Sequence, residues 1–140
     1  MELGRDPIDV VLRQDRAYGP DGCDIDLWMS TLTWPLTLRS GADQVVLPDY
    51  ASIVSELGRV TELAQREGVV RMQTRILSHL RPADDTVILS SIKDRFDADD
   101  KLIGSSSMTW TLVLLDSDWK IRQLSFERSH YGLPSIPSGG

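Results

Sequence analysis

The sequence predicts an α+β domain in which N-terminal helices pack on a strongly bent, mainly antiparallel β-sheet. Apolar residues at helical spacing are confined to the first half of the chain. Four long strand-like runs follow residue 68, and short Asp-rich turns typical of hairpins separate them. Strands of about ten residues or more in a small sheet must twist and bend, so the hollow side of the bend needs helices to cover it.

Chain length and net charge indicate the number of domains and the kinds of partner to expect. The chain has 140 residues, of which 41% are hydrophobic and 26% are charged, which suits one domain with one core. We assign residues 1–130 to this domain and residues 131–140, which are rich in Pro, Ser and Gly, to a flexible C-terminal tail. The formal charge of −6 disfavours nucleic acids and anionic membrane surfaces as partners.

The cysteine count and the N-terminal residues indicate the cellular compartment in which the protein is expected. Cys23 is the single cysteine, so neither an intrachain disulfide nor a C-x-x-C motif can form. The N-terminal residues lack the basic start and apolar run of a signal peptide. No apolar stretch approaches the roughly 20 residues that span a bilayer. We therefore expect a cytoplasmic protein.

Two short helices are predicted first. Asp6-Pro7 is a helix start, because Asp caps free amide groups and Pro suits the first helical position. The Gly- and Pro-containing segment 19–22 ends this helix, and a second one is expected over residues 24–32.

A short hairpin and the longest helix come next. Pro35 forces Trp34 away from helical dihedral angles, so residues 34–38 are predicted as the first strand, which turns into a second at 44–47. The longest helix is expected over residues 50–67, with Gly68 at the position where a left-handed residue ends a helix.

The second half of the chain is predicted as four strands, at residues 69–80, 86–96, 102–115 and 119–128. Strict alternation in the last strand points Trp119 and Ile121 to one face and Leu124 and Phe126 to the other. Both faces would then carry apolar residues. We expect the outer face, which helices leave uncovered, to form a homodimer interface.

Three segments resemble the nuclear-transport-factor-2-like (NTF2-like) superfamily of cystatin-like α+β proteins, which includes ketosteroid isomerases, scytalone dehydratase and SnoaL-like polyketide cyclases. They are TWPLTL at 33–38, EGVVR at 67–71, and SMTWTL at 107–112 followed by DWKIR at 118–122. The resemblance covers residues 8–128. It implies a cone-like domain with a pocket between sheet and helices, usually dimerising through the outer sheet face. It implies no single activity.

The isomerase branch of this superfamily places a base carboxylate just before the proline of the first hairpin, where this sequence has Trp34. It places an acid in the penultimate strand, at a position that falls at or beside Trp110. An indole cannot abstract a proton and offers one N–H donor. The isomerase mechanism is therefore not expected here.

Side chains two positions apart in a strand point to the same face, so a pocket-facing Trp110 predicts which other side chains face the pocket. The expected lining is apolar at one end and polar at the other, and consists of Trp34, Met108, Trp110, Gln123, Ser125 and Glu127. The alternative is that the tryptophans simply fill the core.

Three residues are candidates for acid–base chemistry. Glu127 is one, because desolvation in a pocket raises a carboxyl pKa, although a solvated or ion-paired Glu is the plainer alternative. Asp94 is the second, with pairing to a cross-strand Arg as its alternative. Tyr50 at a helix start is the third, with simple packing at that position as its alternative. The two histidines are far apart in sequence, so neither a metal site nor a cofactor is expected.

We therefore expect a domain that binds a small apolar molecule without established catalysis. One alternative is a SnoaL-like cyclase, isomerase or dehydratase that uses acid–base residues in non-standard positions. The other is a protein-interaction or assembly module. Whether the chain is an enzyme stays open at this point.

Overall fold

The computed structural model describes residues 6–134. Its three helices are α1 (Pro7–Ala17), α2 (Ile25–Met29) and α3 (Tyr50–Glu67). The strands are β1 (Tyr18–Gly19), β2 (Gly22–Cys23), β3 (Leu32–Ser40), β4 (Asp43–Leu47), β5 (Arg71–Ala83), β6 (Thr86–Phe96), β7 (Leu102–Leu115) and β8 (Asp118–Phe126). Helices and short strands thus precede the long strands, as the sequence predicts.

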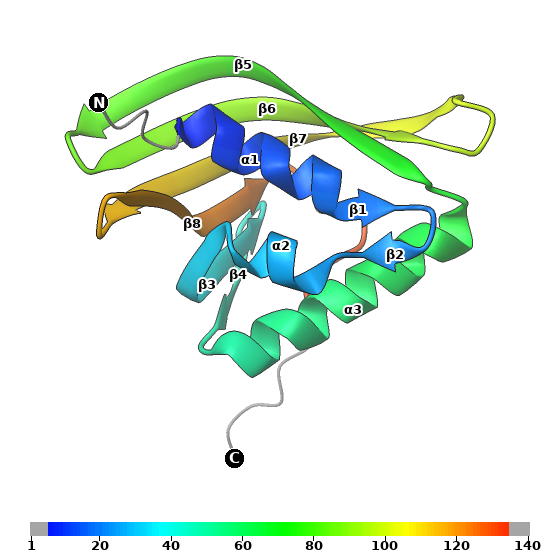
Figure 1. Ribbon diagram of the computed structural model, residues 1–140, viewed down its shortest axis with the longest axis horizontal. Coiled ribbons are helices and arrows are strands. Elements are labelled where there is room, and N and C mark those ends of the chain that lie inside the picture. Colours follow the sequence, from blue (N-terminus) through cyan, green and yellow to red (C-terminus); the bar gives the residue numbers. More distant parts are fainter. Residues whose placement is uncertain (1–5, 135–140) are drawn as a thin grey trace.

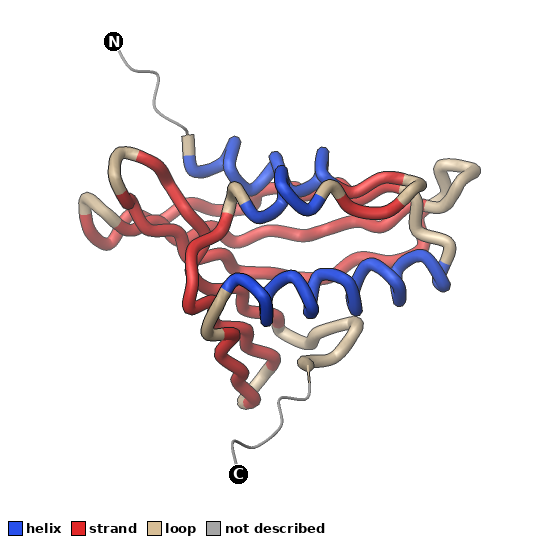
Figure 2. The backbone as a smooth tube through the Cα atoms, turned by 60° about the horizontal axis from the view of Figure 1, so that its bottom comes forward, coloured by secondary structure: helices blue, strands red, loops and turns tan. Residues whose placement is uncertain are grey.

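Six strands form one strongly curved sheet in the order β4-β3-β8-β7-β6-β5. Every neighbouring pair is antiparallel except β3 and β8, which run parallel. The helices lie on the hollow side: α1 contacts β5 and β8, and α3 lies opposite α1 (Figure 1). Figure 2 shows α1 and α3 apart from each other, with strands of the sheet visible between them. The predicted α+β class, with helices on a bent and mainly antiparallel sheet, is confirmed.

Side-chain caps fix where the helices begin. The carboxylates of Asp6, Asp24 and Asp49 accept hydrogen bonds from backbone N–H groups of the first helical turns, at 2.9, 3.1 and 2.9 Å respectively. Gly68 ends α3 with a φ of 87°, a left-handed conformation that favours glycine. The second helix is shorter than predicted and ends at Met29, because Leu32 already belongs to a strand.

A β-bulge in β8 overturns the alternation that the sequence predicts for this strand. Leu112 pairs with Ile121 but Thr111 pairs with Gln123, so Arg122 is an extra residue on β8. Residues after the bulge therefore change faces. Trp119, Ile121 and Leu124 all lie buried in the core, and Phe126 packs against it. The prediction that both faces of β8 carry apolar residues is wrong.

The core lies between the hollow face of the sheet and the helices. Its largest fully buried side chain is Trp110, from the centre of β7. Around it pack apolar residues from α1, α3, β3 and β6, among them Val10, Ile53, Leu36 and Leu89. None of the helices within residues 6–134 combines the length and hydropathy of a bilayer-spanning segment.

Candidate functional site

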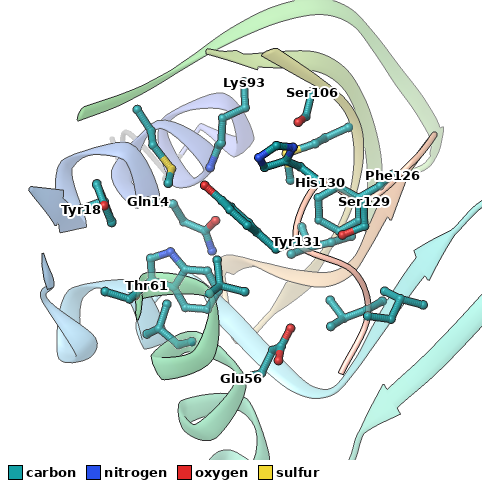
Figure 3. Close-up of a pocket in the computed structure, with 18 of the residues that line it drawn as sticks. Gln14, Tyr18, Glu56, Thr61, Lys93, Ser106, Phe126, Ser129, His130 and Tyr131 are labelled. Atoms are coloured by element: carbon teal, nitrogen blue, oxygen red, sulfur yellow. The ribbon is translucent and has the colours of Figure 1, made fainter. Parts of the chain in front are cut away.

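A cavity of about 140 Å³ lies between the hollow face of the sheet and the three helices (Figure 3). The exposed part of its lining is largely apolar. The sheet supplies Leu36, Leu38, Met108, Leu124 and Phe126 to it, and α3 supplies Ile53, Leu57 and Val60. A cavity at this place follows from the fold, because a bent sheet and straight helices cannot remain in contact along their whole length.

The segment just after β8 closes one end of the cavity. Residues 129–133 line it, and α3 holds them in place. The Arg59 guanidinium donates to the carbonyl oxygens of Tyr131 (2.9 Å) and Gly132 (2.8 Å), while Glu56 holds the same guanidinium at 2.7 and 2.8 Å. The sequence assigns residues 131–140 to a tail. The structure packs 131–134 against the domain, and 135–140 lie outside the described residues.

Glu67, at the end of α3, is hydrogen-bonded to two side chains that line the cavity, His130 and Tyr131. Its Oε1 accepts a hydrogen bond from the Tyr131 hydroxyl at 2.8 Å, and its Oε2 lies 2.5 Å from His130 Nε2. Burial raises the pKa of Glu67, but the hydrogen bonds from His130 and Tyr131 outweigh burial and lower it overall. Burial, and then the nearby carboxylate, raises the pKa of the Tyr131 phenol well above its usual range. Glu67 is therefore ionised and Tyr131 is neutral near neutral pH.

Two cations of β6, Lys93 and Arg95, line the cavity from the sheet side. Burial lowers the pKa of Lys93, and this effect is opposed by Asp15 of α1, whose carboxylate lies 3.6 Å from the ammonium. Arg95 is 5% exposed, and its Nη1 donates to Ser106 Oγ at 2.8 Å. Its buried Nε has no hydrogen-bond partner among the described residues.

The other polar groups of the lining come from the N-terminal part of the chain. Gln14 is buried and donates to Thr31 Oγ1 at 2.9 Å. The Tyr18 hydroxyl donates to the carbonyl of Val69 at 2.6 Å. Burial, reinforced by the charge of Asp24, raises the pKa of the Cys23 thiol to about 11. Gln14 and Tyr18 are neutral groups with hydrogen-bond partners, and the raised pKa keeps the Cys23 thiol neutral. The three side chains therefore add little charge to the cavity.

The structure does not bring the predicted pocket residues together. Met108 lines the cavity, whereas Trp110 lies in the core behind it with its ring 5.2 Å from Lys93 Nζ. Trp34 is 44% exposed and packs edge-on against Tyr50 at 5.5 Å, in a separate shallow hollow beside the turn after β7. The exposed position of Trp34 reflects the irregular register of β3 between Leu32 and Thr37.

The polar half of the predicted lining faces the other way because of the β8 bulge. Gln123 pairs with Thr111 and Ser125 with Thr109, and both lie on the outer face of the sheet. Glu127 is exposed in a third hollow, beside Arg128 and the serines of β7. The prediction that Gln123, Ser125 and Glu127 line the cavity is therefore corrected.

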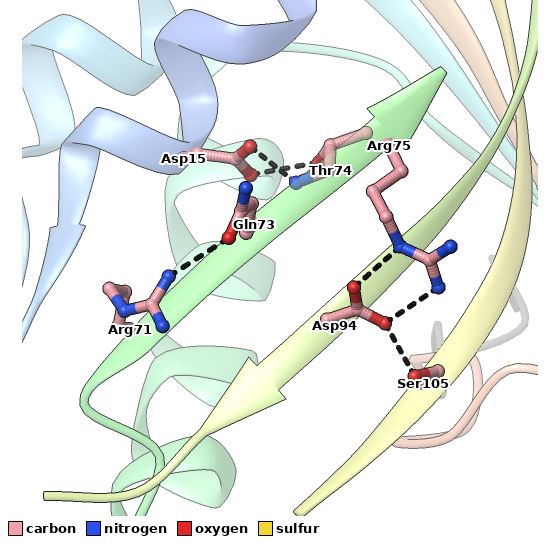
Figure 4. Close-up of polar contacts among 7 residues, drawn as sticks. All are labelled: Asp15, Arg71, Gln73, Thr74, Arg75, Asp94 and Ser105. Carbon is pink, nitrogen blue, oxygen red and sulfur yellow. Dashed lines mark hydrogen bonds and ion pairs between the residues drawn. The ribbon is translucent and has the colours of Figure 1, made fainter. Parts of the chain in front are cut away.

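Asp94 also lies on the outer face, where it is paired (Figure 4). Arg75 of the neighbouring strand donates to its two oxygens at 2.7 and 3.2 Å, and Ser105 Oγ donates at 2.6 Å. The hydrogen bonds from Arg75 lower the pKa of the Asp94 carboxyl. Pairing with a cross-strand Arg, the alternative that the sequence left open, is what the structure shows. Asp94 thus lies on the face of the sheet opposite the cavity and is held as a carboxylate.

Sequence reasoning missed Lys93, Arg95, His130 and Tyr131. A usable signal existed for the first two, since they continue the alternation of Val87, Leu89 and Ser91 along one face of β6. No such signal marks His130 and Tyr131, because their placement depends on contacts with α3. Within residues 6–134, no three His, Cys, Asp or Glu side chains converge into a possible metal site.

Comparison with solved structures identifies the fold. An NTF2-like protein of unknown function from Shewanella oneidensis MR-1 aligns with a TM-score of 0.65 at 14% identity, over 85% of this chain and 93% of that one. A protein of unknown function with a cystatin-like fold from Nostoc punctiforme PCC 73102 aligns at 0.63 and 12%, over 93% and 90%. Aln2 from a Streptomyces species aligns at 0.64 and 17%, over 86% of each chain. The chain matches no protein-family model and no curated protein.

Proposed function

We propose that this chain, which has the NTF2-like, cystatin-like fold, binds one small and largely apolar molecule in the cavity under its sheet. The observation that carries the proposal is the cavity itself, about 140 Å³ in volume and with an exposed lining that is largely apolar. An apolar cavity of about 150 Å³ stays dry and admits benzene. The fold alone does not fix an activity, so the proposal rests on the site.

Benzene is a suitable first probe because it matches the cavity in size and polarity. We expect benzene to shift the amide resonances of Leu57, Val60 and Met108 in heteronuclear NMR spectra. Val60→Phe fills the cavity from α3 and should abolish these shifts. The matched control is Val46→Phe, which adds the same ring at an exposed site on β4. Absence of benzene-dependent shifts in the wild-type protein would contradict the proposal.

A second candidate function is acid–base catalysis at the closed end of the cavity. The observation that favours it is the Glu67–His130–Tyr131 group, in which one carboxylate orients an imidazole and a phenol that both line the cavity. General acid–base catalysis uses groups arranged in this way. The earlier candidates Glu127, Asp94 and Tyr50 lie elsewhere and do not support it.

Proton exchange tests this candidate without knowledge of the substrate. Cyclohexanone incubated with the protein in D₂O should exchange its α-protons faster than in buffer, and His130→Gln should remove the increase. Lys101→Gln, at an exposed turn, is the matched control. Exchange at the buffer rate would leave simple binding as the function of the cavity.

We also propose that the chain forms a homodimer through the outer face of the sheet. Half-buried Ile88, Ile92 and Val113 lie on this face and support the proposal, since the bulge has turned Leu124 and Phe126 inward. Light scattering at micromolar concentration should give twice the chain mass, and Ile92→Lys should give the monomer. A monomeric wild-type protein would contradict the dimer and leave the outer face available to another partner.

We further propose a reducing, cytoplasmic location. The single cysteine, which cannot form an intrachain disulfide, supports it. Fractionation of the source cells tests it, and recovery of the chain outside the cytoplasmic fraction would contradict it.

A further inference from the structure

We propose that Lys93 and Arg95 form a carboxylate-binding subsite in the cavity, so that the ligand is a small aromatic carboxylic acid with one ring of benzene size. The inference deepens the proposed function, because it assumes that the cavity binds a small molecule. It assigns the apolar lining to the ring and the two β6 cations to the carboxylate.

The two cations are placed to act together. Residues 93 and 95 lie two positions apart on β6, so their side chains leave the same face about 7 Å from each other, and both line the cavity. Arg95 is almost fully buried, and its Nε donor has no hydrogen-bond partner among the described residues, since the Glu67 oxygen with which it forms an ion pair is 3.6 Å away. A buried guanidinium donor without an acceptor is costly, and a carboxylate is the acceptor that best matches its planar geometry.

The charges around the cavity favour an anionic ligand over a neutral one. Within residues 6–134, Glu56 is the one carboxylate that lines the cavity, and Arg59 holds both of its oxygens. Asp15 and Glu67 lie behind the lining. Each forms an ion pair with one cation at 3.6 Å, to Lys93 Nζ and Arg95 Nε respectively, which is longer than a hydrogen bond. The hydrogen bonds to the Glu67 oxygens come from His130 and Tyr131. The lining itself therefore carries two cations whose ion-pair partners lie outside it, and neither cation donates a hydrogen bond to a carboxylate of the described residues.

Gly104 gives the guanidinium the space that it occupies. It pairs directly with Arg95 across β6 and β7, and a Cβ at residue 104 would lie 2.5 Å from Arg95 Nη2. A side chain at this position would push the guanidinium away. Because Nη2 is the end of a flexible side chain, the substitution Gly104→Ala should displace Arg95 without unfolding the protein.

Benzoate and nitrobenzene test the subsite, because the two probes have the same shape and differ in charge. Benzene, nitrobenzene and benzoate are titrated into the wild-type protein near neutral pH and followed by NMR. We expect benzoate to bind at least about ten-fold more tightly than nitrobenzene. Arg95→Met should remove this preference, and Gly104→Ala should reduce it. Arg122→Gln, which removes an exposed cation from β8, is the charge-matched control and should keep it.

The outcomes separate this inference from the proposal on which it rests. If benzene and nitrobenzene bind but benzoate binds no more tightly, the subsite is refuted while the apolar cavity remains. If Arg95→Met or Gly104→Ala keeps the full preference for benzoate, the subsite is refuted as well. If none of the three probes binds, both proposals fail. If Arg95→Met does not fold, the affinities of the wild-type protein for benzoate and nitrobenzene decide whether the subsite exists.

Discussion

Ser91 Oγ accepts a hydrogen bond from the indole Nε1 of Trp110 at 2.7 Å, in the centre of the core. The same oxygen donates to the carbonyl of Met108 at 3.1 Å. Ser91 is 2% exposed and Trp110 is fully buried, so no solvent competes for this contact. The pair explains how the largest core side chain keeps its one polar group satisfied, and how a polar residue is tolerated at the back of an apolar cavity.

We predict that Ser91→Ala destabilises the protein by about 1–3 kcal/mol, because it leaves the buried indole N–H without an acceptor. Urea unfolding measures the change. Ser90→Ala, on the outer face of the same strand, should cost less than about 0.5 kcal/mol. In a double-mutant cycle, Trp110→Phe should make the additional cost of Ser91→Ala small. Full additivity would show that the hydrogen bond contributes nothing.

We predict that Leu124→Ala costs about 2–4 kcal/mol of unfolding free energy, because Leu124 is 5% exposed in the core. Gln123→Ala, on the outer face, should change it by no more than about 0.5 kcal/mol. The same urea unfolding experiment serves both variants. The reverse order of effects would place Gln123 inside and would mean that β8 lacks the bulge at Arg122.

We predict that Cys23 alkylates slowly, because burial raises the pKa of its thiol to about 11. A free cysteine has a pKa of about 8.5, so iodoacetamide at mildly alkaline pH should modify Cys23 about a hundred-fold more slowly than N-acetylcysteine. Mass spectrometry follows the single modification. Urea should restore the ordinary rate, and benzene should slow the folded protein further because Cys23 lines the cavity. An ordinary rate in the folded protein would contradict the raised pKa of this half-buried thiol.

We predict that Asp94→Asn destabilises the protein by about 1–2 kcal/mol at neutral pH, because it weakens the contact with Arg75. The pKa of Asp94 is lowered in the folded state, so its contribution is complete above the unfolded-state pKa of about 4 and is lost as the pH falls through the folded-state value. The difference between variant and wild type should therefore narrow below about pH 4. Asp99→Asn, at an exposed turn, is the control. A difference that does not depend on pH would exclude the carboxylate charge as its cause.

Local signals were sufficient to predict the helix starts and most strand limits. Asp6 and Asp49 begin helices because a carboxylate before the first turn caps free N–H groups, and Gly68 ends α3 because it accepts a left-handed backbone. The strands at 86–96 and 102–115 match the predicted ranges, since turn residues bound each apolar run. The class of the fold follows from the order of these elements.

The tertiary structure alone decided the faces of the last strand and the composition of the cavity. An extra residue such as Arg122 leaves no mark in an alternating pattern until a partner strand fixes the register, and one such residue turns every later side chain to the opposite face. Lys93, Tyr131 and Val60 share one cavity only because β6, the segment after β8 and α3 converge there. The chain thus specifies its elements through contacts between near neighbours, and its site through contacts between distant ones.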